Sequence, residues 1–244
     1  MVLLVSIAPI LSTMPVHAMQ ATPISPPGKS GRIGIDRITA CPQIVKNPSF
    51  EQGLNYWDGY PYMPQIVTSP VYEGAHSIED IPEHYGYSLV YQYLPAYEDI
   101  GHYDDYDAIA HVYIHKEYMK PNEPTMISFE LASGGKPVIE YEIYIPPNTT
   151  DMKLKAIVVG RVTVSADIPD TYDRWLTLEI VVTDSTTNPS MDHVAFYYNG
   201  QQIWQGDVQD IKDVYIVQMY HHDLDGPGYI AYWDQILFYD LDSC

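Results

Sequence analysis

Apolar and polar residues alternate with a period of two along most of the second half of the chain. This alternation is typical of strands with one buried face, because successive side chains of a strand point to opposite sides. The segments that show it are 126–132, 138–145, 175–182, 194–204, 213–220 and 229–241. Apart from a turn near 207–213, we find no helical stripe, and there is no internal repeat. Many short strands separated by turns predict an all-β chain folded as an antiparallel β-sandwich.

The clearest hairpin lies in VAFYYNGQQIW, residues 194–204. Asn199 and Gly200 supply the residues of a two-residue type I′ turn. Counting back from this turn pairs Tyr198 with Gln201, Tyr197 with Gln202, and Phe196 with Ile203. In that register Tyr197 and Trp204 lie diagonally on the face opposite to Phe196, within reach of each other.

Aromatic side chains offer two candidate ligand sites. The first is the pair Tyr197 and Trp204, flanked by Gln202, whose rings would stack on the apolar face of a sugar. The alternative is that a second sheet covers this face, and alternation alone does not decide between the two. The second candidate is the loop around YWDGYPYMP, with Trp57, Tyr60 and Tyr62.

The charge of the chain excludes two classes of partner. The 244 residues include 12 Lys and Arg against 32 Asp and Glu, a formal net charge of −20. Such a surface repels phosphate backbones and anionic headgroups, so binding to nucleic acid or to a membrane surface is disfavoured. Tyrosine is abundant, with 23 residues, and it suits both half-buried strands and surfaces that contact sugars or proteins.

The N-terminus predicts export. The first 18 residues form a short apolar stretch that ends in Val16-His17-Ala18, which fits the small-residue rule for signal cleavage. We expect a signal peptide over 1–18, a Pro/Gly/Ser-rich linker or N-terminal arm over 19–40, and a single domain over 41–244. The alternative is a short N-terminal anchor that stays uncleaved. Export places the protein outside the cell or at its surface.

The two cysteines bracket the expected domain. In an oxidising compartment two cysteines usually pair, and a bridge between Cys41 and Cys244 requires their Cα atoms to lie within about 7 Å. The pairing therefore predicts that the two ends of the domain are adjacent. Two unrelated thiols, or a bridge from Cys244 to a second molecule, are the alternatives. Export also agrees with one N-glycosylation sequon, at Asn148.

Three stretches resemble a known family. NPSFEQGLNYW, residues 47–57, resembles the start of secreted jelly-roll carbohydrate-binding modules of the families four and nine type, which begin with an Asn, a Phe-Glu pair, a Gly and a Trp. VYEGAHSIE (71–79) is similar to the family's next landmark, and YIAYWDQILFYDL (229–241) to its closing strand. The second half also looks like laminin-G and concanavalin-type jelly rolls, a group that includes lectins, glucanases and polysaccharide lyases. The resemblance implies a jelly-roll sandwich, and fold alone does not fix function.

The same resemblance implies a structural calcium between the first and last strands. By matching position, Glu51 and Asp234 would be ligands, although Gln235 stands where the family often has a second Asp. A separate stretch, HHDLDGPG, carries Asp223 and Asp225 at a calcium-like spacing. The neighbouring His221 and His222 would favour zinc or copper, but adjacent residues of a strand point to opposite faces. An ordinary solvated turn is the alternative for this stretch.

Three acids form the candidate catalytic set. Glu140 and Glu142 share one face of a strand, and a turn through ASGGK would place Glu130 directly opposite Glu140. Like charges so placed repel, so a cation bridges them, one is protonated as a general acid, or water solvates them all. The last of these is the simplest for so acidic a chain.

These observations favour non-catalytic carbohydrate binding at or outside the cell surface, with a polysaccharide or glycan as the partner. A structural subunit of an extracellular filament or surface layer, assembling through its N-terminal arm, is the second class. A polysaccharide hydrolase or lyase is the third, and it predicts that Glu130 and Glu140 converge. Motifs of serine hydrolases, zinc proteases and phosphate-binding loops are absent from the sequence.

Overall fold

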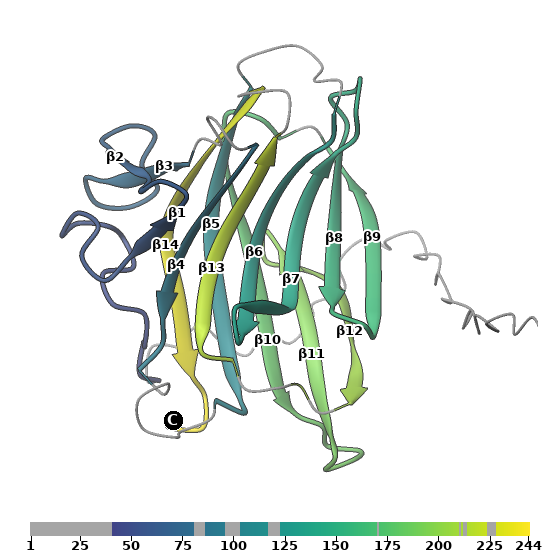
Figure 1. Ribbon diagram of the computed structural model, residues 1–244. Coiled ribbons are helices and arrows are strands. Elements are labelled where there is room, and N and C mark those ends of the chain that lie inside the picture. The colour runs from purple at the N-terminus through teal and green to yellow at the C-terminus, as the bar shows by residue number, and fades with distance from the viewer. Residues whose placement is uncertain are drawn as a thin grey trace, which may run out of the picture.

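The computed structural model describes residues 41–244, except 81–85, 96–102, 117–122, 170, 210, 212–213 and 224–227. The expected signal peptide and linker, residues 1–40, lie outside this part. Two seven-stranded antiparallel sheets pack face to face (Figure 1), and the described residues contain no helix. The prediction of an antiparallel β-sandwich of jelly-roll type is therefore confirmed. Within the described chain, no helix is present that has the length and apolar character needed to cross a membrane.

The sheet nearer the viewer in Figure 1, which we call the front sheet, has the strand order β1-β4-β13-β6-β7-β8-β9. Its strands are β1 (Asp58–Tyr60), β4 (Tyr87–Tyr93), β13 (Ile216–Asp223), β6 (Thr125–Ser133), β7 (Lys136–Ile145), β8 (Met152–Val158) and β9 (Val162–Ile168).

The other sheet, the back sheet, has the order β12-β11-β10-β5-β14-β3-β2. Its strands are β12 (Gln201–Gln209), β11 (Met191–Tyr198), β10 (Trp175–Asp184), β5 (Tyr106–Lys116), β14 (Tyr229–Asp240), β3 (Ser77–Asp80) and β2 (Gln65–Val67). The inward side chains of both sheets form one apolar core.

Strand β5, at the centre of the back sheet, was not predicted. Its inward residues include Ala108, Ala110, Val112 and Ile114, all fully buried. Small alanines on one face and histidines and tyrosines on the other give a weak apolar alternation, so the pattern does not stand out in the sequence. The strand is nevertheless held on both sides, by β10 and by β14.

The β11–β12 hairpin forms as expected at its turn but not beyond it. Asn199 and Gly200 both have a positive φ, and Tyr198 pairs with Gln201. The ladder then shifts register after Tyr197, and Phe196 pairs with Trp204, so the predicted pairing with Ile203 is wrong. A β-bulge of this kind adds one residue to one strand and reverses the faces of those that follow.

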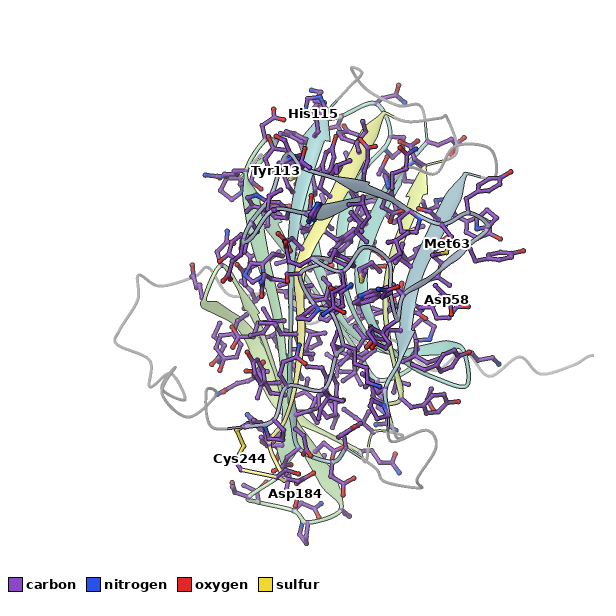
Figure 2. The ribbon with its side chains drawn as sticks, turned by 90° about the vertical axis from the view of Figure 1, so that its left-hand side faces the viewer. Asp58, Met63, Tyr113, His115, Asp184 and Cys244 are labelled. Carbon is purple, nitrogen blue, oxygen red and sulfur yellow. A yellow bond between two sulfur atoms is a disulfide. The ribbon has the colours of Figure 1, made fainter. Side chains whose placement is uncertain are left out.

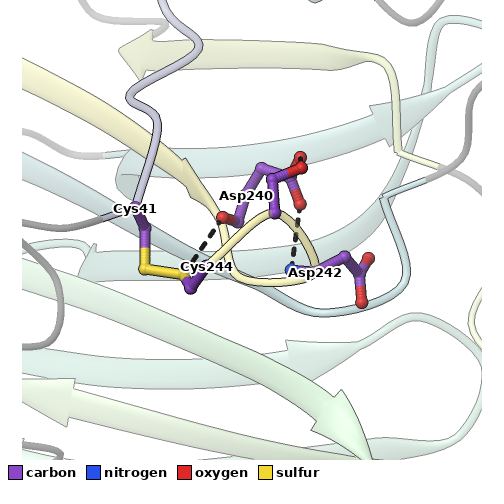
Figure 3. Close-up of a disulfide and its surroundings, with 5 residues drawn as sticks. Cys41, Asp240, Asp242 and Cys244 are labelled. Atoms are coloured by element: carbon purple, nitrogen blue, oxygen red, sulfur yellow. Dashed lines mark hydrogen bonds between the residues drawn. A yellow bond between two sulfur atoms is a disulfide. The ribbon is translucent and has the colours of Figure 1, made fainter.

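The ends of the described chain lie side by side. The Cys41–Cys244 disulfide is present, with the two Cα atoms 4.8 Å apart (Figure 3). Beside it, the segment after Cys41 runs along the second half of β14, where Gln43 bridges Tyr239 and the Ile44 N–H donates to the Phe238 carbonyl over 2.8 Å. The adjacent termini of the predicted sandwich are therefore confirmed.

The stretch NPSFEQGLNYW forms a turn that covers one end of the core. Phe50 is fully buried and Trp57 is 3% exposed, with their ring centroids 5.2 Å apart. Asn47 holds the turn together, because its side chain donates to the Gly53 carbonyl and accepts from the Gln52 N–H, while the Trp57 indole donates to the Asn47 carbonyl. The polar and aromatic residues on which the resemblance rests serve packing here.

Candidate functional site

The outer face of the front sheet carries a row of polar side chains across its central strands. Adjacent strands place Tyr91, Gln218, Glu130 and Glu140 side by side in that order, from β4 through β13 and β6 to β7. The predicted pairing of Glu130 with Glu140 is therefore confirmed. Outward-facing strand positions are normally solvated, yet Glu130 and Gln218 are each only 6% exposed.

Glu130 lies at the centre of this row and is held on both sides. The Ser128 hydroxyl donates to its Oε1 atom over 2.5 Å, and the Gln218 amide donates to its Oε2 atom over 2.5 Å. Burial raises the pKa of Glu130, the two hydrogen bonds oppose that rise, and the charge of Glu142 adds to it. The carboxyl group is thus fixed in position by neutral donors.

Glu140 is the proton-bearing candidate of the cluster. Burial raises its pKa to about 7, and the neighbouring carboxylates of Glu130 and Glu142 add to the rise, while Lys155 opposes it. Glu142 is paired with Lys155, whose ammonium donates to the Glu142 Oε1 atom over 2.5 Å and lies 3.7 Å from the centroid of the Tyr144 ring. A carboxyl group with a pKa near neutrality, beside a second fixed carboxyl group, can give or take a proton.

Aromatic rings form a row next to these acids. Tyr60 of β1, Tyr87 of β4, and Tyr220 and His222 of β13 follow one another with centroid separations of 6.1, 6.2 and 6.2 Å. We call these four residues the aromatic row. Tyr220 pairs with Ser128 in the neighbouring strand, which brings the row against the side of the acidic cluster.

The predicted aromatic ligands divide between surface and core. Tyr60, in β1 of the front sheet, is 56% exposed, and Tyr62, in the loop between β1 and β2, is 52% exposed. Trp57 is buried, as described above, so its ring cannot contact a ligand.

The predicted platform of Tyr197 and Trp204 does not form. After the register shift Trp204 lies on the inward face with Phe196, its ring centroid 6.1 Å from that of Phe196. The ring also lies over Gly206, where an added Cβ atom would come within 2.8 Å of Trp204 Cζ2. Tyr197 and Gln202 remain paired on the outer face. The bulge that separates the two rings leaves no mark in the alternation pattern.

The expected calcium ligands Glu51 and Asp234 both bind backbone N–H groups of one loop. Glu51 accepts from Ala75 and His76, and Asp234 accepts from Tyr72 and Glu73. These bonds lower the pKa of Glu51, led by that from Ala75, whereas burial raises the pKa of Asp234. Among the described residues no group of three or more His, Cys, Asp or Glu side chains is placed to hold a metal ion. A calcium ion at this closure stays a prediction.

The HHDLDGPG stretch is described only in part, since Asp225 lies outside the described residues. Asp223 is fully buried at the end of β13, and its Oδ2 atom accepts from the Gly228 N–H. The two histidines point to opposite faces, because His221 is fully buried inside the sandwich and His222 belongs to the aromatic row. Asn148, the expected glycosylation site, is exposed in the turn between β7 and β8.

A second polar cluster contains a serine, a histidine and an aspartate, but not in catalytic order. The Ser185 and Thr187 hydroxyls both donate to Asp207, and the His193 ring contacts Asp207 directly. These bonds, led by that from Thr187, lower the pKa of Asp207 to about 2. A serine nucleophile requires the histidine between the hydroxyl and the carboxylate, and here Ser185 and His193 each contact Asp207 separately.

The sequence did not indicate that Gln218, Tyr220 and Tyr87 belong to a ligand surface. Each lies on an outward position of a strand in the front sheet. Gln218 and Tyr220 belong to a segment with recognised alternation, but Gln218 is found opposite Glu130 only because β13 pairs with β6. The signal was absent because the strand that pairs with β6 cannot be read from one sequence.

Comparison with known proteins supports the fold. No protein-family model matches the chain, and no curated protein matches it. Among solved structures, the carbohydrate recognition domain of Emp47p is 8% identical, with a TM-score of 0.53 over 81% of this chain and 97% of that one. The CBM2 module of the evolved Dit of Lactobacillus casei BL23 phage J-1 is 11% identical, with a TM-score of 0.51 over 78% and 92%.

A botulinum neurotoxin type C structure, described as dependent for cell entry on two ganglioside molecules, is 12% identical, with a TM-score of 0.52 over 86% of this chain. The chain spans half the length of that toxin chain. At these identities the shared property is the β-sandwich, and these matches do not show the particular carbohydrate-binding family suggested by NPSFEQGLNYW.

Proposed function

We propose that this protein is an exported carbohydrate-binding protein that holds a glycan against the outer face of its front sheet. The observation that carries the proposal is the aromatic row beside the buried, hydrogen-bonded carboxyl group of Glu130 and the half-buried Glu140 opposite it. The disulfide that closes the domain agrees with an oxidising compartment. The carbohydrate-binding names among the structural matches are consistent with the proposal.

The chemistry of a sugar matches this surface. A pyranose has an apolar ring face, which packs on aromatic side chains, and a rim of hydroxyl groups, which bond to a few well-placed polar groups. Tyr87 and Tyr220 supply the rings, and Gln218, Glu130 and Glu140 supply donors and acceptors within the adjoining strands. Because Glu130 is held by Ser128 and Gln218, little conformational entropy is lost when a ligand binds.

The experiment is affinity electrophoresis in gels that contain soluble neutral polysaccharides, followed by calorimetry with oligosaccharides of any that retards the protein. We expect Tyr220→Ala to weaken binding at least tenfold, about 1.4 kcal/mol. The matched control is Tyr197→Ala, which removes a half-buried tyrosine from the outer face of the back sheet. Equal losses in both variants, or no retardation in any polysaccharide, would contradict the proposal.

Glycan cleavage is the second candidate, and the pKa of Glu140 favours it. A carboxyl group with a pKa of about 7 directly opposite Glu130 resembles the pair of acids that glycosidases use, one as a proton donor. Incubating the retained polysaccharide with the protein and measuring new reducing ends tests this function. Release that is abolished by Glu140→Gln, with binding retained, would make the protein an enzyme.

Assembly into a filament or surface layer is the remaining alternative. Its expected arm, residues 19–40, lies outside the described residues. Size-exclusion chromatography with light scattering on the mature chain separates it from the proposal. A monomer agrees with a binding protein, whereas growth into large assemblies would favour the structural role.

A further inference from the structure

A pocket lies at the end of the aromatic row, between the edge of the back sheet and β4. It has a volume of about 230 Å³ and is lined by Pro61, Tyr62, Met63, Pro64, Gln65, Glu79, Asp80, Tyr87 and Ser88. Met63 marks its position on the front-sheet side in Figure 2, opposite Tyr113 of the back sheet. With about 30 Å³ per water molecule, the pocket has the volume of about eight waters, which suits one pyranose residue.

The outer wall of the pocket is a tight loop. The chain doubles back after β1 so closely that a Cβ atom at Gly59 would come within 2.5 Å of the Tyr62 carbonyl oxygen. Only glycine fits at position 59, and its missing side chain allows the loop to pack directly against β1. Tyr62 and Met63 are left 52% and 48% exposed at the rim. Exposed large side chains around a concavity are typical of a ligand site.

Asp80 forms the polar end of the pocket. It belongs to β3, its side chain is only 1% exposed, and its Oδ2 atom accepts no hydrogen bond from the described residues. Burial raises the pKa of Asp80 to about 7, and the nearby side chains of Ser88 and Trp233 oppose that rise, although their Oγ and Nε1 atoms make no hydrogen bond of good geometry in the described structure. A buried carboxyl oxygen without a donor costs stability unless a ligand supplies that donor.

The lining selects for positive charge. It contains two acids, Glu79 and Asp80, the two tyrosine rings of Tyr62 and Tyr87, and no Lys, Arg or His. A carboxylate with aromatic walls is the usual environment for an organic ammonium group, which pairs with the charge and lies over the rings. The net charge of −20 draws cations towards the whole surface and adds to this preference.

We infer that this pocket binds one amino sugar residue of the glycan, with its protonated amino group directed at Asp80 and its ring against Tyr62 and Tyr87. Tyr87 belongs both to the aromatic row and to the pocket, so one glycan chain can occupy both. This inference rests on the proposed function, because the pocket extends the glycan surface described above.

The test compares three β-1,4-linked hexasaccharides that differ only at C2, carrying a hydroxyl, an acetamido or an amino group. Calorimetry with the intact chain should show that the amino form binds at least tenfold more tightly than the hydroxyl form at low salt. Asp80→Asn should remove this advantage, so that the amino and hydroxyl forms bind the variant with equal affinity. Tyr62→Leu, at an exposed position that does not contribute to the core, should reduce the advantage at least threefold.

General attraction between a polyamine and an acidic protein needs its own control. Asp167→Asn removes one charge from a side chain that is 90% exposed on β9 of the same sheet, and it should leave the advantage of the amino form unchanged. An amino form that binds no more tightly than the hydroxyl form would overturn the inference. So would an advantage that survives both Asp80→Asn and Tyr62→Leu.

The two failures are distinguishable. If the hydroxyl form binds and Tyr220→Ala weakens it, the proposed function stands whatever the pocket does. If none of the three forms binds but another polysaccharide retards the protein, the inference fails and the proposed function stands; if no polysaccharide retards the protein either, both fail.

Discussion

The two outer faces of this sandwich both carry aromatic side chains, but they use them differently. On the back sheet, Tyr72 stacks on His111 with ring centroids 3.7 Å apart, and its edge meets Trp175 at 5.7 Å. Tyr113 meets Trp175 at 5.6 Å and Tyr232 at 5.9 Å, in both cases edge to face. On the front sheet, the aromatic row has separations above 6 Å throughout.

The difference lies in what covers each face. Tyr72 comes from the loop after β2, and the same loop donates its N–H groups to Asp234 and Glu51, so the chain itself closes the back face. On the front sheet, the rings of the aromatic row lie too far apart to cover one another's faces. The polar groups beside them are buried by residues of the neighbouring strands. Rings that already satisfy each other stabilise a fold, whereas an open row beside fixed carboxyl groups can receive a ligand.

Removal of the disulfide should have the largest effect, and it belongs to the back sheet alone. The loop between Cys41 and Cys244 spans a sequence separation of 203 residues, for which the chain-entropy relation gives about 5 kcal/mol. We expect a Cys41→Ser/Cys244→Ser variant to unfold at much lower urea concentration while it still binds glycan below its unfolding transition. Reduced wild-type protein is the control and should match the variant. Lost binding in folded variant protein would contradict the separation of the two faces.

Truncation of Trp175 should affect stability without affecting binding. This half-buried ring is the partner of both Tyr72 and Tyr113, so its removal breaks the closed cluster. We expect Trp175→Ala to lower the free energy of unfolding by about 2 kcal/mol, less than for a fully buried tryptophan. Urea denaturation measures the loss. Glycan affinity should stay within twofold of wild type, and a tenfold loss would place a ligand on the back face.

Much of the fold could be predicted from the sequence, and the site only in part. Strand alternation identified β6, β7, β10 and β14. The predicted pairing of Glu130 with Glu140 is present, but the turn does not produce it by itself: Ser133 pairs with Lys136, and a register shift between Leu131 and Ala132 brings Glu130 opposite Glu140 instead of Ile139. The neighbours Gln218 and Tyr220 come from a strand almost 90 residues away, and no local pattern reports such a pairing. The single-residue bulge near Phe196 similarly redirected Trp204 without a sequence signal.

The pKa of Glu140 makes the front face sensitive to pH. Its carboxyl group has an ordinary pKa of 4.5, which burial beside Glu130 raises to about 7 in the folded protein. Between these values the folded state binds more protons than the unfolded state, so this group's contribution to stability falls as pH rises from 4.5 to 7. We expect Glu140→Gln to stabilise the protein by about 1 kcal/mol at pH 8, discounted for partial solvent exposure, and by nothing at pH 4.

Thermal unfolding at the two pH values gives the answer. If the Tm of Glu140→Gln exceeds that of the wild-type protein at pH 8 but not at pH 4, the raised pKa of the half-buried Glu140 is supported. If the variant and the wild-type protein have the same Tm at pH 4 and also at pH 8, water solvates Glu140 fully, which is the simplest interpretation of the sequence.

The smallest expected effect concerns Lys155, which is the nearest positive charge to the acidic cluster. Its ammonium pairs with Glu142 and lowers the pKa of Glu140, so Lys155→Met should raise the pKa of Glu140 from its value of about 7. The control is Lys153→Met, two residues along β8, whose ammonium lies 3.8 Å from the exposed Asp167. Carbon-detected NMR titration of the glutamate side chains measures both variants. A rise in Lys155→Met alone shows that one strand neighbour tunes the cluster, because water screens the charge of Lys153. Equal rises in the two variants would mean that the acids sense the net charge of the surface, and the front face would then differ from the back only in its rings.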